Sequence, residues 1–332
     1  MHFNEIPYQT KDYFSIRQDY EFEKLALEAF RYQFQNNTVY RDFCGYLLKS
    51  PENVVCVEEI PFLPIELFKN QIVISGSSES EAIFKSSGTT GTNQSKHFVK
   101  DLAIYRSTAI EGFKRVFGSP SDFSFIALLP GYMDRPDSSL IYMVNEFMGQ
   151  SKAKNNGFFK DPSADFFNAV EFNRHNHIPT ILFGVTFSLL KLAESSPIEL
   201  NEFHIIETGG MKGSGEELTR DELHVILKDA FKTNHIYSEY GMTELLSQAY
   251  TKGAQDFELP AWMKVYIREV NDPQAFLPDQ KVGAINIIDL ANIHSCCFIA
   301  TQDLGKKTSP NTFQVLGRFD NADIRGCNLL YL

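Results

Sequence analysis

Hydroxyl groups and glycines gather in one short segment of this chain, Ser86-Ser87-Gly88-Thr89-Thr90-Gly91, and Lys96 follows it. Glycine lets the backbone approach a ligand closely, and the N–H and O–H groups of such a turn can all point at anionic oxygens. A Walker A loop would need a glycine directly before the lysine, and Ser95 stands there instead. Taken alone, the segment is as compatible with a hydroxyl-rich surface loop as with a phosphate-binding turn.

A second segment with chemical potential is Tyr237-Ser238-Glu239-Tyr240-Gly241-Met242-Thr243-Glu244, which begins in a predicted strand. Open α/β sheets bind ligands at the carboxyl ends of their strands. Thr243 offers a hydroxyl to a phosphate oxygen, Glu244 a hard oxygen ligand to Mg²⁺, and Tyr240 a ring face to a base. Thr243 and Glu244 could equally open a helix, as an N-cap with an acidic first turn.

Three further segments are weaker signals, and each alone favours an ordinary turn. Residues 207–215 form a glycine-dense turn that contains Gly209 and Gly210. Asp303, in Thr301-Gln302-Asp303, is predicted at the end of a strand, where a carboxylate could accept from both ribose hydroxyls. The last two stretches, 317–321 and 324–328, contain Arg318 and Cys327.

The elements that must position these residues alternate along the middle of the chain, which predicts a largely parallel sheet with helices on both faces. Apolar runs predict strands at Phe123–Leu129, Thr180–Phe183, Phe203–Glu207, His235–Tyr237, Ala284–Leu290, Cys296–Thr301 and Phe313–Leu316. Amphipathic spacing predicts helices at residues 13–35, Asp101–Val116, Ser138–Met148, Ala164–His175, Thr186–Glu194 and Gly215–Phe231.

The fold class predicted is therefore α/β, with a smaller β-rich lobe after Pro260, where strands become closely spaced. We expect three segments. Residues 1–80 form an N-terminal helical region that packs on the main domain, 81–260 an α/β nucleotide-binding core, and 261–332 the β-rich lobe with the C-terminal tail.

Composition excludes several classes of protein. The 332 residues carry 31 Lys and Arg against 42 Asp and Glu, a net charge of -11, so the basic footprint of a nucleic-acid binder is missing. Five cysteines without CxxC spacing indicate neither a disulfide framework nor a zinc site. No apolar run has the length of a signal peptide or a membrane span, which favours a cytoplasmic protein.

The order of the motifs SSGTTG, GG, YGMTE, T-x-D and GRxDN resembles the adenylate-forming, acyl-activating superfamily. Within it, the chain is most similar to the acyl-protein synthetase family, typified by the fatty-acid ligase component of bioluminescence. The stretches LALEAFRYQFQNNTVYRDFC, IPFLPIELFK and RFDNADIRGCNLLYL carry this closer resemblance. It implies the large-domain architecture of adenylate-forming enzymes without their mobile C-terminal domain.

The resemblance implies two cofactors, ATP and Mg²⁺, and a set of residues around them. Those implied to bind ATP are Ser86, Ser87, Gly88, Thr89, Thr90, Gly91, Gly209, Gly210, Tyr240, Gly241, Asp303 and Arg318. Lys96 would assist at the phosphates, Thr243 would touch the α-phosphate and Glu244 would ligate Mg²⁺. Tyr240 would stack on the adenine, and Asp303 would bind the ribose with Arg318 beside it.

For acyl transfer, the resemblance implies that Cys327 accepts the acyl group as a thioester. Phe183-Gly184-Val185 would line the acid pocket, although these residues suit a buried strand–helix junction equally well. The expected partners are a carboxylic acid and an acyl reductase or acyl-carrier protein. The alternatives are an aryl- or acyl-CoA ligase, disfavoured because no mobile domain of ~100 residues follows Asp320, and a catalytically silent nucleotide-binding subunit.

Overall fold

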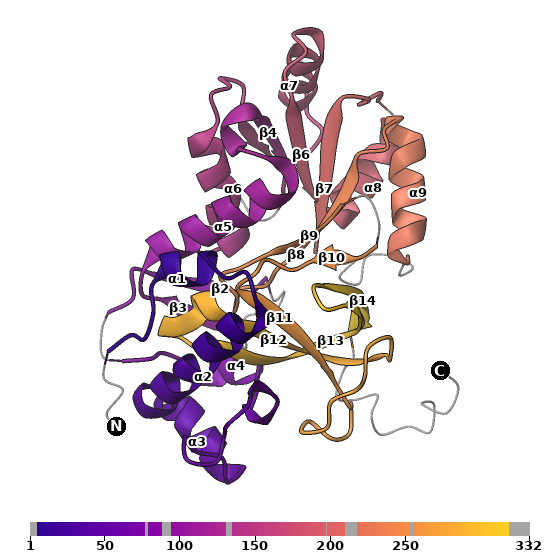
Figure 1. Ribbon diagram of the computed structural model, residues 1–332. Coiled ribbons are helices and arrows are strands. Elements are labelled where there is room, and N and C mark those ends of the chain that lie inside the picture. The colour runs from indigo at the N-terminus through magenta and orange to yellow at the C-terminus, as the bar shows by residue number, and fades with distance from the viewer. Residues whose placement is uncertain are drawn as a thin grey trace. The chain divides into compact units, whose positions relative to one another are not determined.

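The computed structural model describes residues 5–76, 79–87, 94–130, 135–196, 198–209, 218–252 and 255–318. The chain divides into two compact units (Figure 1). One unit consists of residues 1–77 together with 261–332, and the other of residues 78–260. Residues 1–77 of the first expected segment and all of the third therefore belong to one unit.

The unit of residues 78–260 is built on a sheet whose order is β10-β9-β8-β7-β6-β4-β5. Strands β4 to β8 run parallel, whereas β9 and β10 are antiparallel to their neighbours. The strands are β4 (Ser124–Leu128), β5 (Gly157–Phe159), β6 (Thr180–Val185), β7 (Phe203–Thr208), β8 (Ile236–Tyr240), β9 (Ala249–Thr251) and β10 (Phe257–Glu258). A separate hairpin pairs β2 (Ala82–Lys85) with β3 (Lys96–Val99).

Helices cover both faces of this sheet, as the alternation of the sequence predicts. They are α5 (Leu102–Phe117), α6 (Ser139–Gln150), α7 (Ala164–His175), α8 (Thr186–Ser195) and α9 (Arg220–Phe231), with a 3₁₀ turn at Pro120–Asp122. Phe125 of β4 packs against Phe113 of α5 and Phe147 of α6. The next residue, Ile126, points to the opposite face and joins a core cluster with Leu189 of α8. Period-two alternation thus gives each face its own apolar layer.

The other unit contains an antiparallel sheet of order β11-β12-β13-β14, with β1 added parallel to β13. Its strands are β1 (Leu63–Pro64), β11 (Met263–Arg268), β12 (Gly283–Asp289), β13 (Phe298–Ser309) and β14 (Thr312–Arg318). Its helices are α1 (Thr10–Phe14), α2 (Asp19–Asn36), α3 (Thr38–Tyr46) and α4 (Leu67–Asn70), with 3₁₀ turns at Val57–Glu59 and Leu290–His294.

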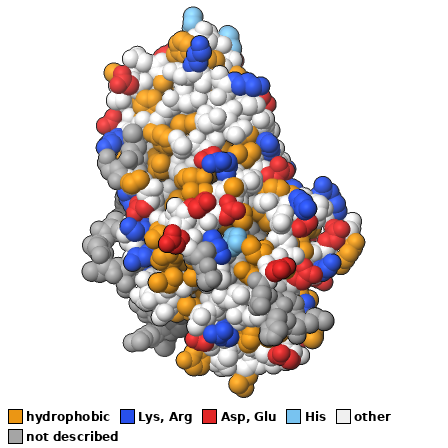
Figure 2. Space-filling model, turned by 90° about the vertical axis from the view of Figure 1, so that its left-hand side faces the viewer, with side chains coloured by type: hydrophobic (Ala, Val, Ile, Leu, Met, Phe, Trp, Pro, Cys, Tyr) orange, Lys and Arg blue, Asp and Glu red, His pale blue; other side chains and the backbone are white. Residues whose placement is uncertain are grey.

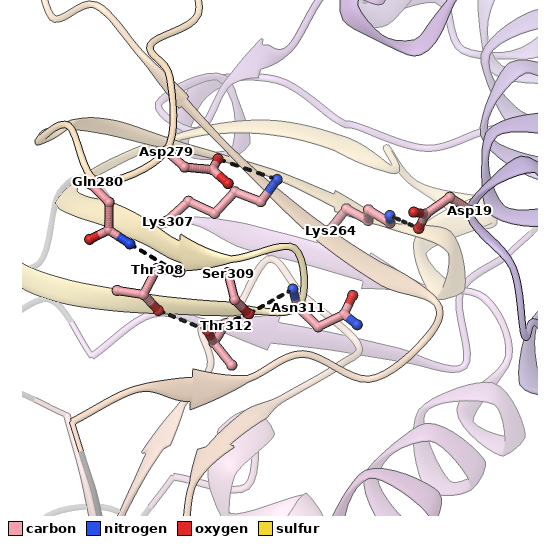
Figure 3. Close-up of polar contacts among 9 residues, drawn as sticks. All are labelled: Asp19, Lys264, Asp279, Gln280, Lys307, Thr308, Ser309, Asn311 and Thr312. Atoms are coloured by element: carbon pink, nitrogen blue, oxygen red, sulfur yellow. Dashed lines mark hydrogen bonds and ion pairs between the residues drawn. The ribbon is translucent and has the colours of Figure 1, made fainter.

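Long-range contacts join the two ends of the chain within this unit. The buried Gln33 amide of α2 donates to the carbonyls of Asn292 and Ile293 and accepts from the backbone N–H of Cys297. Figure 3 shows two ion pairs around the same sheet, Lys264 with Asp19 and Lys307 with Asp279, the latter at 3.6 Å. The hydrogen bond and charge of Lys264 lower the pKa of Asp19.

Several predicted boundaries are wrong, and two of the differences change the description of the fold. Residues 13–35 form not one helix but two, because Gln18 caps α2 and the Glu21 carboxylate accepts from the Gln18 N–H, which starts a new helix there. The strand expected to end at Thr301 continues to Ser309, because β14 pairs with it over most of that length. Asp303 therefore lies inside a strand.

The cysteines of the described part are free thiols. Cys296 and Cys297 are fully buried just before β13, and Cys44 is buried in α3. Cys56 is exposed. Burial and the nearby Glu59 raise the pKa of Cys56.

On the face shown in Figure 2, Lys and Arg side chains are scattered among Asp and Glu and form no continuous basic area. No helix in the part of the chain that the structure describes combines the length and the apolar character needed to cross a membrane.

Replacing Gly184 tests the packing of β6 on α8. A Cβ at Gly184 would lie 2.7 Å from Cδ2 of Leu189, whose side chain is fully buried, so Gly184→Ala should lower the free energy of unfolding by about 1–3 kcal/mol. Gly149→Ala is the matched control, because nothing lies within 4 Å of a Cβ there, and it should be neutral or stabilising. Urea unfolding measures both, and equal effects would contradict the packing argument.

Candidate active site

The hydroxyl-rich segment begins and ends at the β2–β3 hairpin. Residues 88–93, which include Gly88, Thr89, Thr90 and Gly91, lie outside the described residues. At its two ends, the Ser86 N–H donates to the Ser95 carbonyl (3.1 Å), and the Ser95 N–H donates to the Ser86 hydroxyl (3.0 Å). Lys96 follows as the first residue of β3, with an exposed side chain. The hairpin thus fixes Ser86, where the segment begins, beside Ser95, which precedes Lys96.

The guanidinium of Arg135, which the sequence analysis did not identify, supports this hairpin. Arg135 Nη2 donates to the carbonyls of Lys85 and Ser86, both at 3.1 Å. Asp137 pairs with Arg135 (3.4 Å) and with Lys85 Nζ (3.1 Å). The cluster holds the strand that leads into the segment. Its only sequence signal was an Arg-Pro-Asp turn before a helix.

His97 joins the hairpin to the second motif. It is 1% exposed, and its Nδ1 lies 2.8 Å from the carbonyl oxygen of Thr243. Burial lowers the pKa of His97 to about 4, so the ring is neutral near pH 7. A carbonyl only accepts, so Nδ1 carries the proton. The residue next to Lys96 therefore holds the backbone of the predicted catalytic turn.

Thr243 and Glu244 lie in a turn and do not open a helix. The Leu245 N–H donates to the Met242 carbonyl at 3.1 Å, which closes the turn after β8. Glu244 is only 5% exposed. Within the described ranges no cluster of three or more His, Cys, Asp or Glu side chains could hold a metal. A single carboxylate fits Mg²⁺, which takes most of its ligands from phosphates and water.

A buried carboxyl group, Glu239, occupies one face of the sheet at this edge. Glu239 is 8% exposed, and its Oε2 accepts a hydrogen bond from the Thr208 hydroxyl of β7. Burial raises the pKa of Glu239 to about 7; the Thr208 hydrogen bond opposes this shift, and the charge of Glu207 adds to it. In the sequence, Glu239 lies within the Tyr237–Glu244 motif, and nothing there marks it as a buried, hydrogen-bonded group.

On the opposite face, Glu207 faces α8 and α9. The hydroxyl of Thr186, the first residue of α8, lies 2.9 Å from Glu207 Oε2 and 2.6 Å from the Gly209 carbonyl. Arg220 Nε lies 3.5 Å from Glu207 Oε1, and the Arg220 guanidinium lies over the Phe257 ring. The Thr186 hydroxyl thus holds Gly209, which directly follows β7 and has a φ of 66°. Gly210 lies outside the described residues.

Tyr240 and the residues proposed for the acid pocket are largely covered. Tyr240 is 8% exposed and its ring packs 5.7 Å from that of Phe257. Phe183 and Val185 are buried in β6, on either side of Gly184. These three residues form a strand–helix junction with α8, and their roles toward a ligand stay predictions.

The remaining predicted residues belong to the other unit. Arg318 Nε lies 3.2 Å from Asp303 Oδ1, and the two residues are register partners on β14 and β13. Asp303 is 9% exposed. The structure thus brings Asp303 and Arg318 together as an ion pair. Cys327 lies outside the described residues.

Known proteins that are similar to this chain identify its family. A model of the family described as acyl-protein synthetase, LuxE, matches residues 11–331. The chain belongs to this acyl-protein synthetase family. It is 26% identical over 333 residues to the long-chain-fatty-acid–luciferin-component ligase of Aliivibrio fischeri, covering 92% of this chain and 86% of that protein. The ligase of the same description from Vibrio harveyi is 22% identical over 360 residues, with the same coverage.

Solved structures confirm the fold predicted for an acyl-protein synthetase. A 2-hydroxyisobutyryl-CoA ligase in its postadenylation state matches with a TM-score of 0.65 and 12% identity, covering 91% of this chain and 68% of that one. The amide bond synthetase McbA of Marinactinospora thermotolerans matches with a TM-score of 0.52 and 15% identity, over 74% of this chain. This chain spans half the length of that synthetase. The architecture is that of the adenylate-forming enzymes.

The raised pKa of Glu239 predicts a pH dependence of stability. The folded protein holds a proton on Glu239 up to about pH 7, whereas the unfolded chain releases it near the ordinary value of 4.5. The free energy of unfolding should therefore fall as pH rises from about 4.5 to 7, by at most about 3 kcal/mol from this group. Glu239→Gln removes the titrating group, so the free energy of unfolding of this variant should depend less on pH between about 4.5 and 7.

Urea unfolding between pH 4.5 and 8 measures the effect. Glu171→Gln, which removes an exposed carboxylate of α7, is the control and should keep the wild-type slope. A Glu239→Gln protein with the wild-type slope would show that Glu239 is not the titrating group.

Proposed function

We propose that this protein is an ATP-dependent acyl-protein synthetase that activates a carboxylic acid, of the fatty class, as acyl-AMP. The acyl group then passes to a cysteine thiol. The observation that carries the proposal is the hydrogen bond between His97 and Thr243, because it places the turn of Glu244 beside the end of the hydroxyl-rich segment. The family match and the description of the Aliivibrio fischeri relative as a fatty-acid ligase support the substrate class.

The first half-reaction has to overcome repulsion between two anions. The carboxylate oxygen of the acid attacks the α-phosphorus of ATP, a P–O bond forms, and the bond to the pyrophosphate leaving group breaks. Positioning and electrostatic stabilisation lower such a barrier, and no protein nucleophile is required. In this chain Ser86–Gly91 and Lys96 would bind the phosphates, and the Thr243 hydroxyl would orient the α-phosphate.

Glu244 would hold Mg²⁺, which neutralises charge on the phosphates when it is bound. The turn that carries Glu244 is closed at Met242 and Leu245 and is fixed at Thr243 by His97, so the carboxylate has a defined place. Asp303 would accept hydrogen bonds from the ribose hydroxyls, while Arg318 Nε donates to its Oδ1 and fixes the carboxylate.

In the second half-reaction we propose that the thiolate of Cys327 attacks the acyl carbonyl. A C–S bond forms, the C–O bond to the phosphate breaks, and AMP leaves as the anion. Arg325 stands two residues before Cys327, and a nearby cation favours the thiolate. The acyl group would then move to a partner protein, an acyl reductase or an acyl-carrier protein.

Glu244→Ala should abolish acid-dependent exchange of pyrophosphate into ATP, by at least about 100-fold, because the metal loses its protein ligand. Exchange is measured with radiolabelled pyrophosphate over a panel of carboxylic acids of increasing chain length. Glu171→Ala, on the exposed face of α7, is the control and should exchange at the wild-type rate. A Glu244→Ala protein with wild-type exchange would refute the metal-binding role.

Cys327→Ser should separate the two half-reactions. The variant should keep pyrophosphate exchange, yet lose the acyl label that hydroxylamine removes from the protein, because an acyl-oxygen ester resists mild hydroxylamine better than a thioester. Cys56→Ser is the matched control, since Cys56 is the exposed thiol of the described part. If labelling survives in Cys327→Ser, the acceptor is another group. Rapid thioester formation on free coenzyme A would favour a CoA ligase.

A further inference from the structure

The side chain of Glu239 joins the ends of two neighbouring strands. Thr208 of β7 and Glu239 of β8 are register partners in a parallel pair, and the Thr208 hydroxyl donates to Glu239 Oε2. Thr208 directly precedes Gly209, and Glu239 stands two residues before Gly241. One hydrogen bond thus connects the two strand ends that lead into the proposed nucleotide site.

The other carboxyl oxygen of Glu239 lies directly against Gly241. A Cβ built at Gly241 would be 2.4 Å from Glu239 Oε1 and 3.3 Å from Cγ of Gln248. Gly241 does not adopt a positive φ, so glycine is needed here for space and not for conformation. Because Glu239 is 8% exposed and bonded to Thr208, its carboxyl group has little room to move away.

The surroundings favour the neutral form of this carboxyl group. Among the described residues, the ionisable groups that interact electrostatically with Glu239 are Glu207 on β7, Tyr105 on α5 and Tyr250 on β9. Burial is the main cause that raises the pKa of both tyrosines, so both are neutral phenols. Among the described residues, the charge that raises the pKa of Glu239 is that of Glu207, whose Oε1 lies 3.5 Å from Arg220 Nε.

We propose that Glu239 is a positioning residue that fixes the position of Gly241 relative to the end of β7. Through Gly241 it also fixes the turn that contains Thr243 and Glu244. This inference rests on the proposed function. The turn then has two supports, because His97 holds the Thr243 carbonyl and Glu239 fills the space beneath Gly241. We assign neither residue a contact with the reacting atoms.

A double-mutant cycle between positions 239 and 241 tests the proposal. Gly241→Ala should lower kcat/KM for ATP in pyrophosphate exchange by more than about tenfold, because the new Cβ displaces the turn. Adding Glu239→Ala removes the clashing carboxyl group. The kcat/KM of the double variant for ATP should therefore be at least about threefold higher than that of Gly241→Ala. Gly149→Ala, on α6, is the control glycine and should behave as the wild type.

Glu239→Gln supplies a readout that a merely structural role would not move. The amide keeps the shape and the acceptor for Thr208, so kcat/KM at pH 6 should stay within about twofold of wild type. Above pH 7 the exchange activity of the wild type should fall as the buried carboxyl group ionises. The Glu239→Gln variant has no such group and should not show this fall in activity. If Gly241→Ala fails to fold, Thr208→Val, which removes the hydroxyl at equal volume, should lower kcat/KM for ATP several-fold.

Three outcomes would overturn the inference while leaving the proposed function intact. These are multiplicative effects of the 239 and 241 substitutions, identical pH profiles for wild type and Glu239→Gln, and a Thr208→Val protein with wild-type kinetics. A wild-type protein that exchanges pyrophosphate with no acid of the panel would instead remove the proposed function, and the positioning role with it.

Discussion

The hydrogen bond from His97 to the Thr243 carbonyl is the constraint on which the proposed site depends. It joins residues 146 positions apart, and it does so with a ring that burial keeps neutral. A neutral imidazole adds no charge of its own, so at neutral pH the contribution of His97 is to fix the backbone at Thr243. Lys96, one residue earlier, has its side chain exposed. The strand thus supplies a positioning group and a charge from adjacent positions on opposite faces.

Two acidic side chains at the carboxyl edge of the parallel sheet, Glu207 and Glu239, lie on opposite faces of the sheet. Glu207 faces the helices α8 and α9, where Thr186 and Arg220 satisfy it. Glu239 faces the opposite side, where its partner is an uncharged hydroxyl. Separation by the sheet lets one carboxylate stay paired with a cation while the other is favoured as a neutral acid. The same edge therefore combines a fixed ion pair with a group that titrates near neutrality.

Much of the fold follows from local patterns, because short apolar runs and amphipathic spacing report directly on strands and helices. The helix of residues 164–175 has the predicted bounds. What the sequence could not show were contacts that depend on register: Glu239 faces Thr208 only because β7 and β8 pair in one alignment. Arg135 was missed for a similar reason, since its partners are backbone carbonyls. Asp303 was placed at a strand end because the pairing with β14 leaves no local signal.

The burial of the cysteines has a practical consequence for chemical labelling of the native protein. Cys44, Cys296 and Cys297 are enclosed, and burial raises the pKa of each of these thiols. Cys56 reaches solvent, but its raised pKa leaves little thiolate at neutral pH. A mild alkylating reagent should therefore find few competing sites among these four. Mass spectrometry after brief alkylation can follow the remaining cysteine against a nearly silent background.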